Sequence, residues 1–420
     1  MYLIWFYLTF SLAAIGLLAF VRGWRMPVYG IVLYYALRLM AVGYLYFVGG
    51  YEAFDLHGWY EHAERMLDGE FPGRDFSTPY GLGFNGLLAL SVLIVHHPFS
   101  IVVAFSIIEC IGVLLFRKGF ATAFAPRLGD SVCWLYMTCP FVIGSLGFEM
   151  QDEGILMAVM AGMFYVYVRR IDWLLPIVAA FGLLLTKLLA VIYVAPFFVM
   201  VNLKHACRFI GLVCVCGLVL VMSGVNPLSL RFERLSGSCD EIAKQITCGN
   251  FWYLLKPVMG DAIHPIAQVV LLGAVGLVLL TLFAAVKKRQ EEGNAEVLLW
   301  SISALGLVLV SINKMTYLCY LAPALPFLFA LLIRSCNGKL QSKVIMSLCL
   351  FCWYVVTSVS IVRKLIGDAH YLEIYSIVFP VSCLLLLVML SIKNIKRERL
   401  GLRAVGEGIQ SRIIGLDKQF

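Results

Sequence analysis

The sequence predicts an all-α polytopic membrane protein with about 13 transmembrane helices. Of its 420 residues, 61% are hydrophobic and 14% are charged, whereas soluble domains carry roughly a quarter charged residues. Apolar runs of about 20 residues, long enough to cross a bilayer, recur along the chain. We expect one helical body over residues 1–392, a basic cytoplasmic tail over 393–420 and no large soluble domain.

The apolar runs place the predicted spans in order along the chain. The first run has no basic n-region and no small-residue cleavage site, so we interpret it as a retained helix rather than a signal peptide. The run 81–96 is left out because it fits either a span or a helix lying partly in the interface. The predicted spans are 2–21, 26–48, 99–116, 131–148, 154–168, 171–186, 188–203, 209–225, 265–286, 296–312, 317–333, 344–362 and 375–392.

Charge supports this assignment. With 81–96 not crossing, one side of the membrane receives 22 of the 33 Lys and Arg residues but only 8 of the 25 acidic residues. Because basic loops stay cytoplasmic, we expect an external N-terminus, a cytoplasmic C-terminus and an external first loop. The net charge of +8 therefore belongs to loops that flank the bilayer, and it implies no nucleic-acid partner.

The first external loop, residues 49–98, is acidic and aromatic. Trp59, Ala63, Met66 and Leu67 recur at helical spacing, which predicts a short amphipathic helix on the membrane surface. Asp55 immediately precedes this pattern, so it is either a helix N-cap or a functional carboxylate. The acidic residues of the loop are Glu52, Asp55, Glu61, Glu64, Asp68, Glu70 and Asp75.

A second external acidic motif covers residues 147–154. It carries Glu149, Asp152 and Glu153 at the mouth of two predicted spans. These carboxylates fit solvated loop charges, a divalent-cation site or contacts to a hydroxyl-rich substrate.

Two cationic positions stand at predicted external span ends. Lys187 fits either a side chain snorkelling to the interface or a phosphate contact. Lys314, with Tyr317, opens a Pro-rich span on the same side. Within the spans, Arg38 and Glu109 are predicted to pair with each other or with polar groups of the bundle.

The late external loop, residues 226–264, carries Cys239 and Cys248. They are the only two of 13 cysteines placed outside the membrane, so we predict a disulfide between them. The basic tail 393–420 has interspersed apolar residues, which is typical of a segment lying on anionic lipid. The chain has no GxGxxG, P-loop, HExxH or CxxC signature.

The order of these motifs resembles the GT-C superfamily of membrane glycosyltransferases, which use polyprenyl-phosphate sugars. The first feature is an acidic first loop with an Asp before a surface helix, here FDLHGWYEHAERMLDGEFP. The others are an aromatic–Pro opening at STPYGLGFNGLLAL, the acidic motif CPFVIGSLGFEMQDEG, the Lys of TKLLAVIYVAP and the polar-aromatic entry NKMTYLCYLAPALP. Where the family often has Tyr-Pro-Pro-Leu, this chain has Pro-Tyr-Gly-Leu.

The resemblance implies a site on the extracytoplasmic face of a multi-pass protein, with a bacterial plasma membrane favoured. The donor would be a hexose, mannose first, on a polyprenyl phosphate, transferred with inversion to a lipid-linked or cell-surface glycan. Asp55 would be the catalytic base. The resemblance leaves open whether Mg²⁺ or Mn²⁺ is bound, and the candidate ligands for either ion are Asp55, Asp152 and Glu153. The substrate-binding candidates are Asp75, Tyr80, Glu149, Asp152, Glu153, Lys187, Lys314 and Tyr317.

Two other classes fit the same composition. A polysaccharide polymerase or O-antigen ligase would place its key Arg and His residues in a large late loop, for which 226–264 is the candidate. A transporter or flippase for lipid-linked glycans would use charges buried within its spans, and only Arg38 and Glu109 lie clearly inside them.

Overall fold

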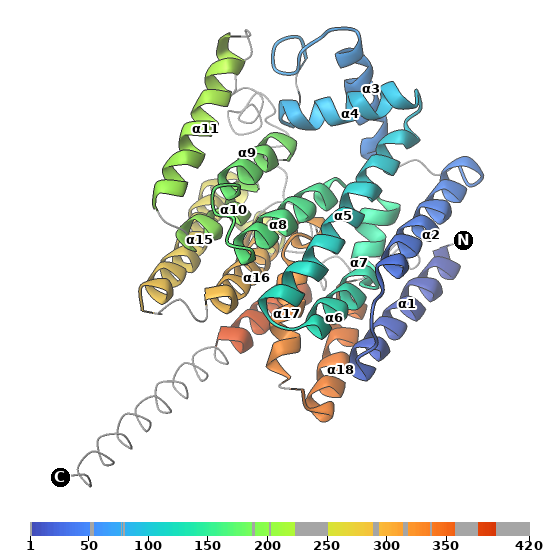
Figure 1. The fold of residues 1–420 in the computed structure, drawn as a ribbon, viewed down its shortest axis with the longest axis vertical. Coiled ribbons are helices and arrows are strands. Elements are labelled where there is room, and N and C mark those ends of the chain that lie inside the picture. Colours follow the sequence, from blue (N-terminus) through green and yellow to red (C-terminus); the bar gives the residue numbers. More distant parts are fainter. Residues whose placement is uncertain are drawn as a thin grey trace, which may run out of the picture.

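The chain folds into a bundle of helices (Figure 1). The computed structural model describes residues 2–50, 54–76, 78, 80–186, 190–200, 203–222, 251–288, 294–313, 318–336, 338–357 and 377–391. In this part of the chain there is no strand, and Pro72 and Phe76 form an isolated bridge. The prediction of an all-α protein is therefore confirmed for the described residues.

The described helices follow in chain order. The first half of the chain contains α1 (Tyr2–Arg22), α2 (Val28–Phe47), α3 (Phe54–Leu67), α4 (Leu82–Ile94), α5 (Phe99–Ala123), α6 (Pro126–Met137), α7 (Pro140–Val142), the π-helix η1 (Ile143–Phe148), α8 (Glu153–Val168), α9 (Leu175–Leu185) and α10 (Ala190–Met200). The second half contains α11 (Leu203–Met222), α14 (Phe251–Met259), the 3-10 turn η2 (Gly260–Ala262), α15 (Ile263–Lys288), α16 (Asn294–Ile312), the 3-10 turn η3 (Leu318–Leu321), α17 (Leu325–Ser335), α18 (Leu340–Thr357) and the helix Ile377–Ser391.

The packing of α5 against α8 forms the centre of the bundle. Gly112 of α5 lies against the backbone of Ala158, where an added Cβ would stand 2.7 Å from Ala158 Cα. Phe116 and Phe120 of α5 then meet Phe164 of α8 in an aromatic cluster with ring centroids 4.8–6.3 Å apart. Close backbone approach and ring packing together fix this helix pair as the platform on which the outer helices lie.

Every predicted span overlaps a helix, but not every helix is long enough to cross a bilayer. Among the described residues, four helical stretches combine sufficient length and apolarity: Val28–Phe47, Phe99–Ala123, Leu254–Lys287 and Ala295–Ile312. By contrast, α9 and α10 have 11 residues each, fewer than the roughly 20 that a crossing helix needs. The structure therefore supports a membrane protein with several apolar helices.

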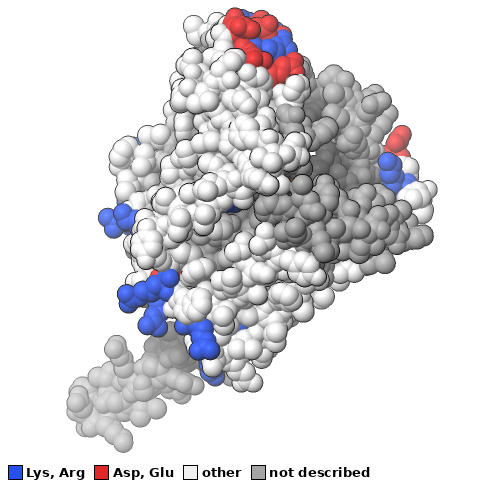
Figure 2. All heavy atoms as spheres, turned by 90° about the vertical axis from the view of Figure 1, so that its right-hand side faces the viewer, with Lys and Arg blue, Asp and Glu red and all other residues white. Residues whose placement is uncertain are grey.

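Connections that the charge pattern assigned to the cytoplasmic side meet at one end of the bundle. The Arg334 guanidinium at the end of α17 lies over the Phe124 ring and pairs with Glu296 at 3.4 Å. The Lys343 ammonium lies 5.8 Å from the ring centroid of Phe20. In Figure 2, several Lys and Arg residues lie toward the lower end of the face shown, and a group of Asp and Glu residues, with Lys or Arg among them, lies at its top.

Helices α3 and α4 lie together at the acidic end, beyond the bundle formed by the other helices (Figure 1). Helix α4 has 13 residues, so at about 1.5 Å per residue it is about 20 Å long, less than the ~30 Å hydrocarbon core. At its first turn, a Cβ on Gly83 would stand 2.9 Å from the Leu184 carbonyl oxygen of α9. The span end that precedes Lys187 thus abuts the start of α4.

Candidate functional site

Helix α3 carries Asp55 on its first turn. The helix begins at Phe54, so Asp55 lies inside it rather than before it, and the expectation that it precedes the helix as an N-cap is corrected. An acidic residue is favourable there because it faces the positive end of the helix dipole. Asp55 is half-buried, and its side chain contacts another segment rather than its own backbone.

The buried face of α3 differs in part from the predicted one. Trp59 and Ala63 are buried as expected, but Leu67 is 39% exposed and Leu56, at 0%, takes part instead. The reason is that the buried face of α3 packs on α4 and α5, and this packing does not extend to the last turn of α3, where Leu67 lies. Trp59 makes edge contacts with Tyr80, Phe84 and Phe105 at centroid distances of 6.3, 6.0 and 5.3 Å.

Tyr80, a predicted substrate contact, belongs to this packing. Its ring stacks on Phe84 with centroids 4.2 Å apart, and the residue is 7% exposed. Its ring therefore helps to hold the first loop on α5, and its contact with substrate stays a prediction.

The end of α3 turns back on itself at Gly69. Gly69 has φ of +89°, and the amides of Gly69 and Glu70 bond the carbonyls of Met66 and Arg65, the pattern of a Schellman cap. Arg65 then binds the Glu70 carboxylate at 2.5 Å and the Asp75 carbonyl at 3.0 Å.

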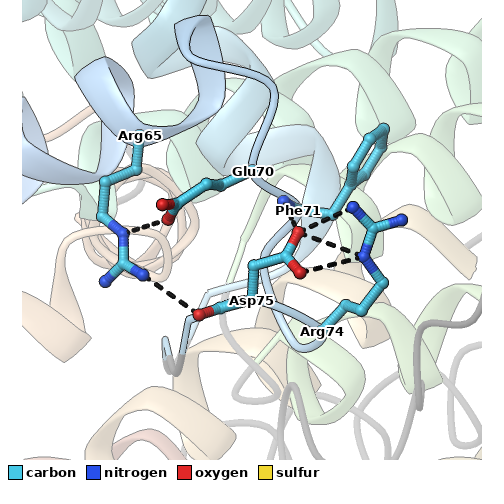
Figure 3. A network of polar contacts seen from close by, with 5 residues as sticks. All are labelled: Arg65, Glu70, Phe71, Arg74 and Asp75. Carbon is cyan, nitrogen blue, oxygen red and sulfur yellow. Dashed lines mark hydrogen bonds and ion pairs between the residues drawn. The ribbon is translucent and has the colours of Figure 1, made fainter.

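Asp75 is held by its own loop (Figure 3). Its Oδ2 accepts from the Phe71 amide at 2.7 Å and from Arg74 Nη2 at 2.7 Å, while Arg74 Nε bonds Oδ1 at 3.1 Å. The bonds from Arg74, and then the one from the Phe71 amide, hold the pKa of Asp75 below its usual value. A carboxylate held ionised in this way is a weak proton acceptor.

The remaining acidic residues of α3 face water or local partners. Glu61 and Asp68 are exposed. The Glu64 carboxylate lies 3.7 Å from His96 Nε2 at the end of α4. On the same helix, partial burial lowers the pKa of His62, whose ring lies against Phe76 with centroids 5.2 Å apart.

The structure brings Asp55 to the second acidic motif. Gln151 Nε2 donates to Asp55 Oδ2 at 3.1 Å and lies 3.2 Å from the Glu149 carbonyl oxygen. Gln151 is the only side chain among the described residues whose hydrogen bond to Asp55 is seen. The first acidic loop and the second acidic motif, joined here by residues 96 positions apart in the chain, therefore lie in contact.

The second motif is a tight turn between η1 and α8. Glu149 is exposed, whereas Asp152 and Glu153 are 3% and 2% exposed at the start of α8. Met150 has φ of +52°, a left-handed conformation that is uncommon for a residue other than glycine. Of the three predicted acidic residues of this motif, only Glu149 thus opens to solvent.

A buried ion pair lies beneath this turn. Arg38 of α2 binds both carboxylate oxygens of Glu109 of α5, with Nη1 to Oε1 at 3.1 Å, and the side chains are 6% and 2% exposed. The hydroxyls of Tyr35 and Tyr136 donate to the same Oε1 at 2.9 and 3.3 Å. The predicted pairing of Arg38 with Glu109 is confirmed.

Several candidates lie outside the described residues: Lys187, Lys314, Tyr317, Cys239 and Cys248. Among the described residues nearby, Tyr193 of α10 donates from its hydroxyl to the Tyr320 carbonyl of η3 at 2.5 Å. The same hydroxyl lies against Gly306 of α16.

The structure does not assemble the suggested metal ligands. Among the described residues, no group of three His, Cys, Asp or Glu side chains is arranged to hold a metal ion. Asp55, Asp152 and Glu153 accordingly do not form a cation site here, and Mg²⁺ or Mn²⁺ enters no step proposed below.

No protein-family model and no curated protein matches this chain. Sequence reasoning missed Gln151, although it stands inside the motif that was singled out. An uncharged amide within an acidic run was the available signal. It also missed Tyr35, which lies one turn before Arg38 on the same helix face.

Proposed function

We propose that this protein is an integral-membrane glycosyltransferase of the GT-C type. It transfers a hexose, mannose first, from a polyprenyl-phosphate donor to a lipid-linked or cell-surface glycan on the extracytoplasmic face. The observation that carries the proposal is the contact between Asp55 and Gln151, which joins two of the motifs on which the resemblance rests.

In the proposed reaction, Asp55 is the general base. Its carboxylate takes the proton of the acceptor hydroxyl while the hydroxyl oxygen attacks the anomeric carbon of the donor. The bond from that carbon to the phosphate oxygen breaks on the opposite face, and the polyprenyl phosphate leaves with the electron pair. The sugar is thereby transferred with inversion.

The choice of Asp55 over its neighbours rests on hydrogen bonding. Asp75 accepts from a backbone amide and from Arg74, so its carboxylate is committed to its own loop. Asp55 receives one described hydrogen bond, on Oδ2, and it is half-buried at the junction of the first loop with the bundle. A base that is fixed in place and not neutralised by an adjacent cation suits proton abstraction.

The leaving phosphate needs cationic partners. In this proposal Lys187 and Lys314 supply them, because both stand at span ends on the external side by sequence. Glu149, Asp152 and Glu153 then shape the sugar or acceptor pocket, and Tyr317 borders it.

The test is a donor panel. Purified protein is incubated with radiolabelled polyprenyl-phosphate mannose, glucose or arabinose and with a lipid or glycan acceptor extract, and label is followed into product. We expect one donor to give a product extended by a single sugar. A ladder of lengthening chains would indicate the polymerase class. Movement of an intact lipid-linked glycan across vesicles without transfer would indicate the transporter class.

A further inference from the structure

The amide at position 151 has a role that the acidic residues around it cannot fill. We propose that Gln151 is a positioning residue that holds the Asp55 carboxylate in its working orientation, on a turn supported from below by the Arg38–Glu109 pair. This inference rests on the proposed function of Asp55 as the base.

The geometry of the amide is the first argument. One carboxamide nitrogen, Gln151 Nε2, lies 3.1 Å from Asp55 Oδ2 and 3.2 Å from the Glu149 carbonyl oxygen. Its two hydrogens can thus serve an oxygen of the first loop and an oxygen of its own turn. Asp or Glu at this position would have no hydrogen to donate and would repel Asp55.

The backbone around Gln151 is the second argument. At the end of the π-helix η1, the backbone N–H of Glu149 donates to the Gly144 carbonyl at 2.9 Å. The backbone N–H of Gln151 donates to the Ser145 carbonyl at 3.0 Å. Between these residues Met150 takes a left-handed backbone with its side chain buried. A π-turn followed by a left-handed residue is an unusual combination that is often found at functional sites.

The ion pair beneath the turn is the third argument. A small cavity of about 10 Å³ is lined by Arg38, Glu109, Met150 and Gln151, among others. Gly154 brings the start of α8 against the pair, since a Cβ there would stand 3.4 Å from Glu109 Cβ. Because the pair is bidentate and buried, its two side chains are held in place and support the turn that packs on them.

These contacts form a continuous path from the bundle to the base. The fixed pair supports the turn, the turn fixes Gln151, and Gln151 orients Asp55. Catalysis is sensitive to such support because a base displaced by about 1 Å can lose on the order of 100-fold in rate.

The experiment compares Gln151→Ala, Gln151→Glu and a matched control, Gln341→Ala, in the transfer assay. Gln341 is exposed at the start of α18, near the basic end of the bundle. We expect Gln151→Ala to lower kcat by about 10- to 100-fold while the KM for donor changes little. Gln151→Glu should lose at least as much, and Gln341→Ala should match wild type.

Melting temperature separates positioning from folding. A positioning role predicts that Gln151→Glu, which is nearly isosteric, keeps the wild-type melting temperature while losing transfer. Wild-type turnover in Gln151→Glu would overturn the proposal, and so would a loss seen only in KM. If the wild-type protein itself transfers no sugar, the proposed function fails and this inference with it. An active wild type with an equally active Gln151→Ala overturns only the positioning role.

Discussion

At the scale of single residues, the carboxylates of the first loop differ in their hydrogen-bond partners. Asp75 is bonded by the Phe71 amide and Arg74, whereas Asp55 reaches across to Gln151. Both were visible in the sequence as acidic residues near an aromatic stretch. Which of them is held by its own loop depends on side-chain geometry that no local pattern encodes.

The Asp75 contact predicts a pH response of the loop. Because the folded-state pKa lies below the ordinary value of 3.8, the carboxylate stabilises the loop above that pH and ceases to do so only as pH falls through the lowered pKa. Hydrogen exchange of residues 70–76 should therefore stay constant from neutral pH to about pH 5 once intrinsic exchange rates are corrected. Asp75→Asn should accelerate it at neutral pH, and Asp68→Asn should not. Equal exchange in the two variants would contradict the assigned role of Asp75.

The buried pair predicts a large cost for removing one partner. Glu109→Gln leaves the Arg38 charge buried and uncompensated, which should lower stability by about 3–5 kcal/mol. The matched control Glu296→Gln disrupts the more exposed pair with Arg334 and should cost at most about 1 kcal/mol. Thermal unfolding in detergent measures both. A Glu109→Gln protein as stable as Glu296→Gln would show that the buried pair is not formed.

At the scale of elements, apolar periodicity located the helices well because hydrophobic runs and glycine or proline stops are local signals. The short amphipathic helix α3 was predicted, whereas the run that contains α4 fitted either a span or a helix lying partly in the interface. The spans predicted on either side of Lys187, 171–186 and 188–203, are short, and the helices α9 and α10 found there are shorter still, with 11 described residues each. The turn that presents Gln151 was also beyond reach, since π-helical and left-handed residues there have no sequence signature.

The contact of α4 with α9 predicts that glycine-to-alanine substitutions at Gly83 and Gly86 change stability in different ways. A Cβ at Gly83 would meet the Leu184 carbonyl oxygen at 2.9 Å, whereas a Cβ at Gly86 would meet nothing within 4 Å. Gly83→Ala should therefore destabilise by about 1–3 kcal/mol through overpacking. Gly86→Ala should be neutral or stabilise by up to about 1 kcal/mol through helix propensity. Thermal unfolding of the two variants compares them directly, and equal shifts would contradict the packing of α4 on α9.

At the scale of the whole molecule, the loops that the sequence separates by charge lie at two ends of the folded bundle. Arg334, Phe124 and Glu296 meet at the basic end, and Asp55 meets Gln151 at the acidic one. The sequence could predict this separation because the bias of basic loops is a property of the whole chain. It could not predict which of the loops and turns touch, since that depends on how the helices pack.

The separation predicts which side of the membrane each end faces. In intact cells or sealed vesicles, a cysteine at Arg74→Cys should react with an impermeant thiol reagent from outside. A cysteine at Arg117→Cys should react only after permeabilisation. Arg74 lies in the first loop and Arg117 near the end of α5, with α4 between them in the chain. Labelling of both positions from one side would mean that α4 crosses the membrane.

The most direct test of the central claim is the single-turnover transfer rate of Asp55→Asn beside Glu64→Gln. Loss of a general base should lower the rate by about 10²–10⁴-fold in Asp55→Asn while protein yield and melting temperature stay near wild type. Glu64→Gln, on the same helix and near His96, should retain most of the transfer. Wild-type-like transfer in Asp55→Asn would contradict the account and shift the search to Asp75 or Asp152.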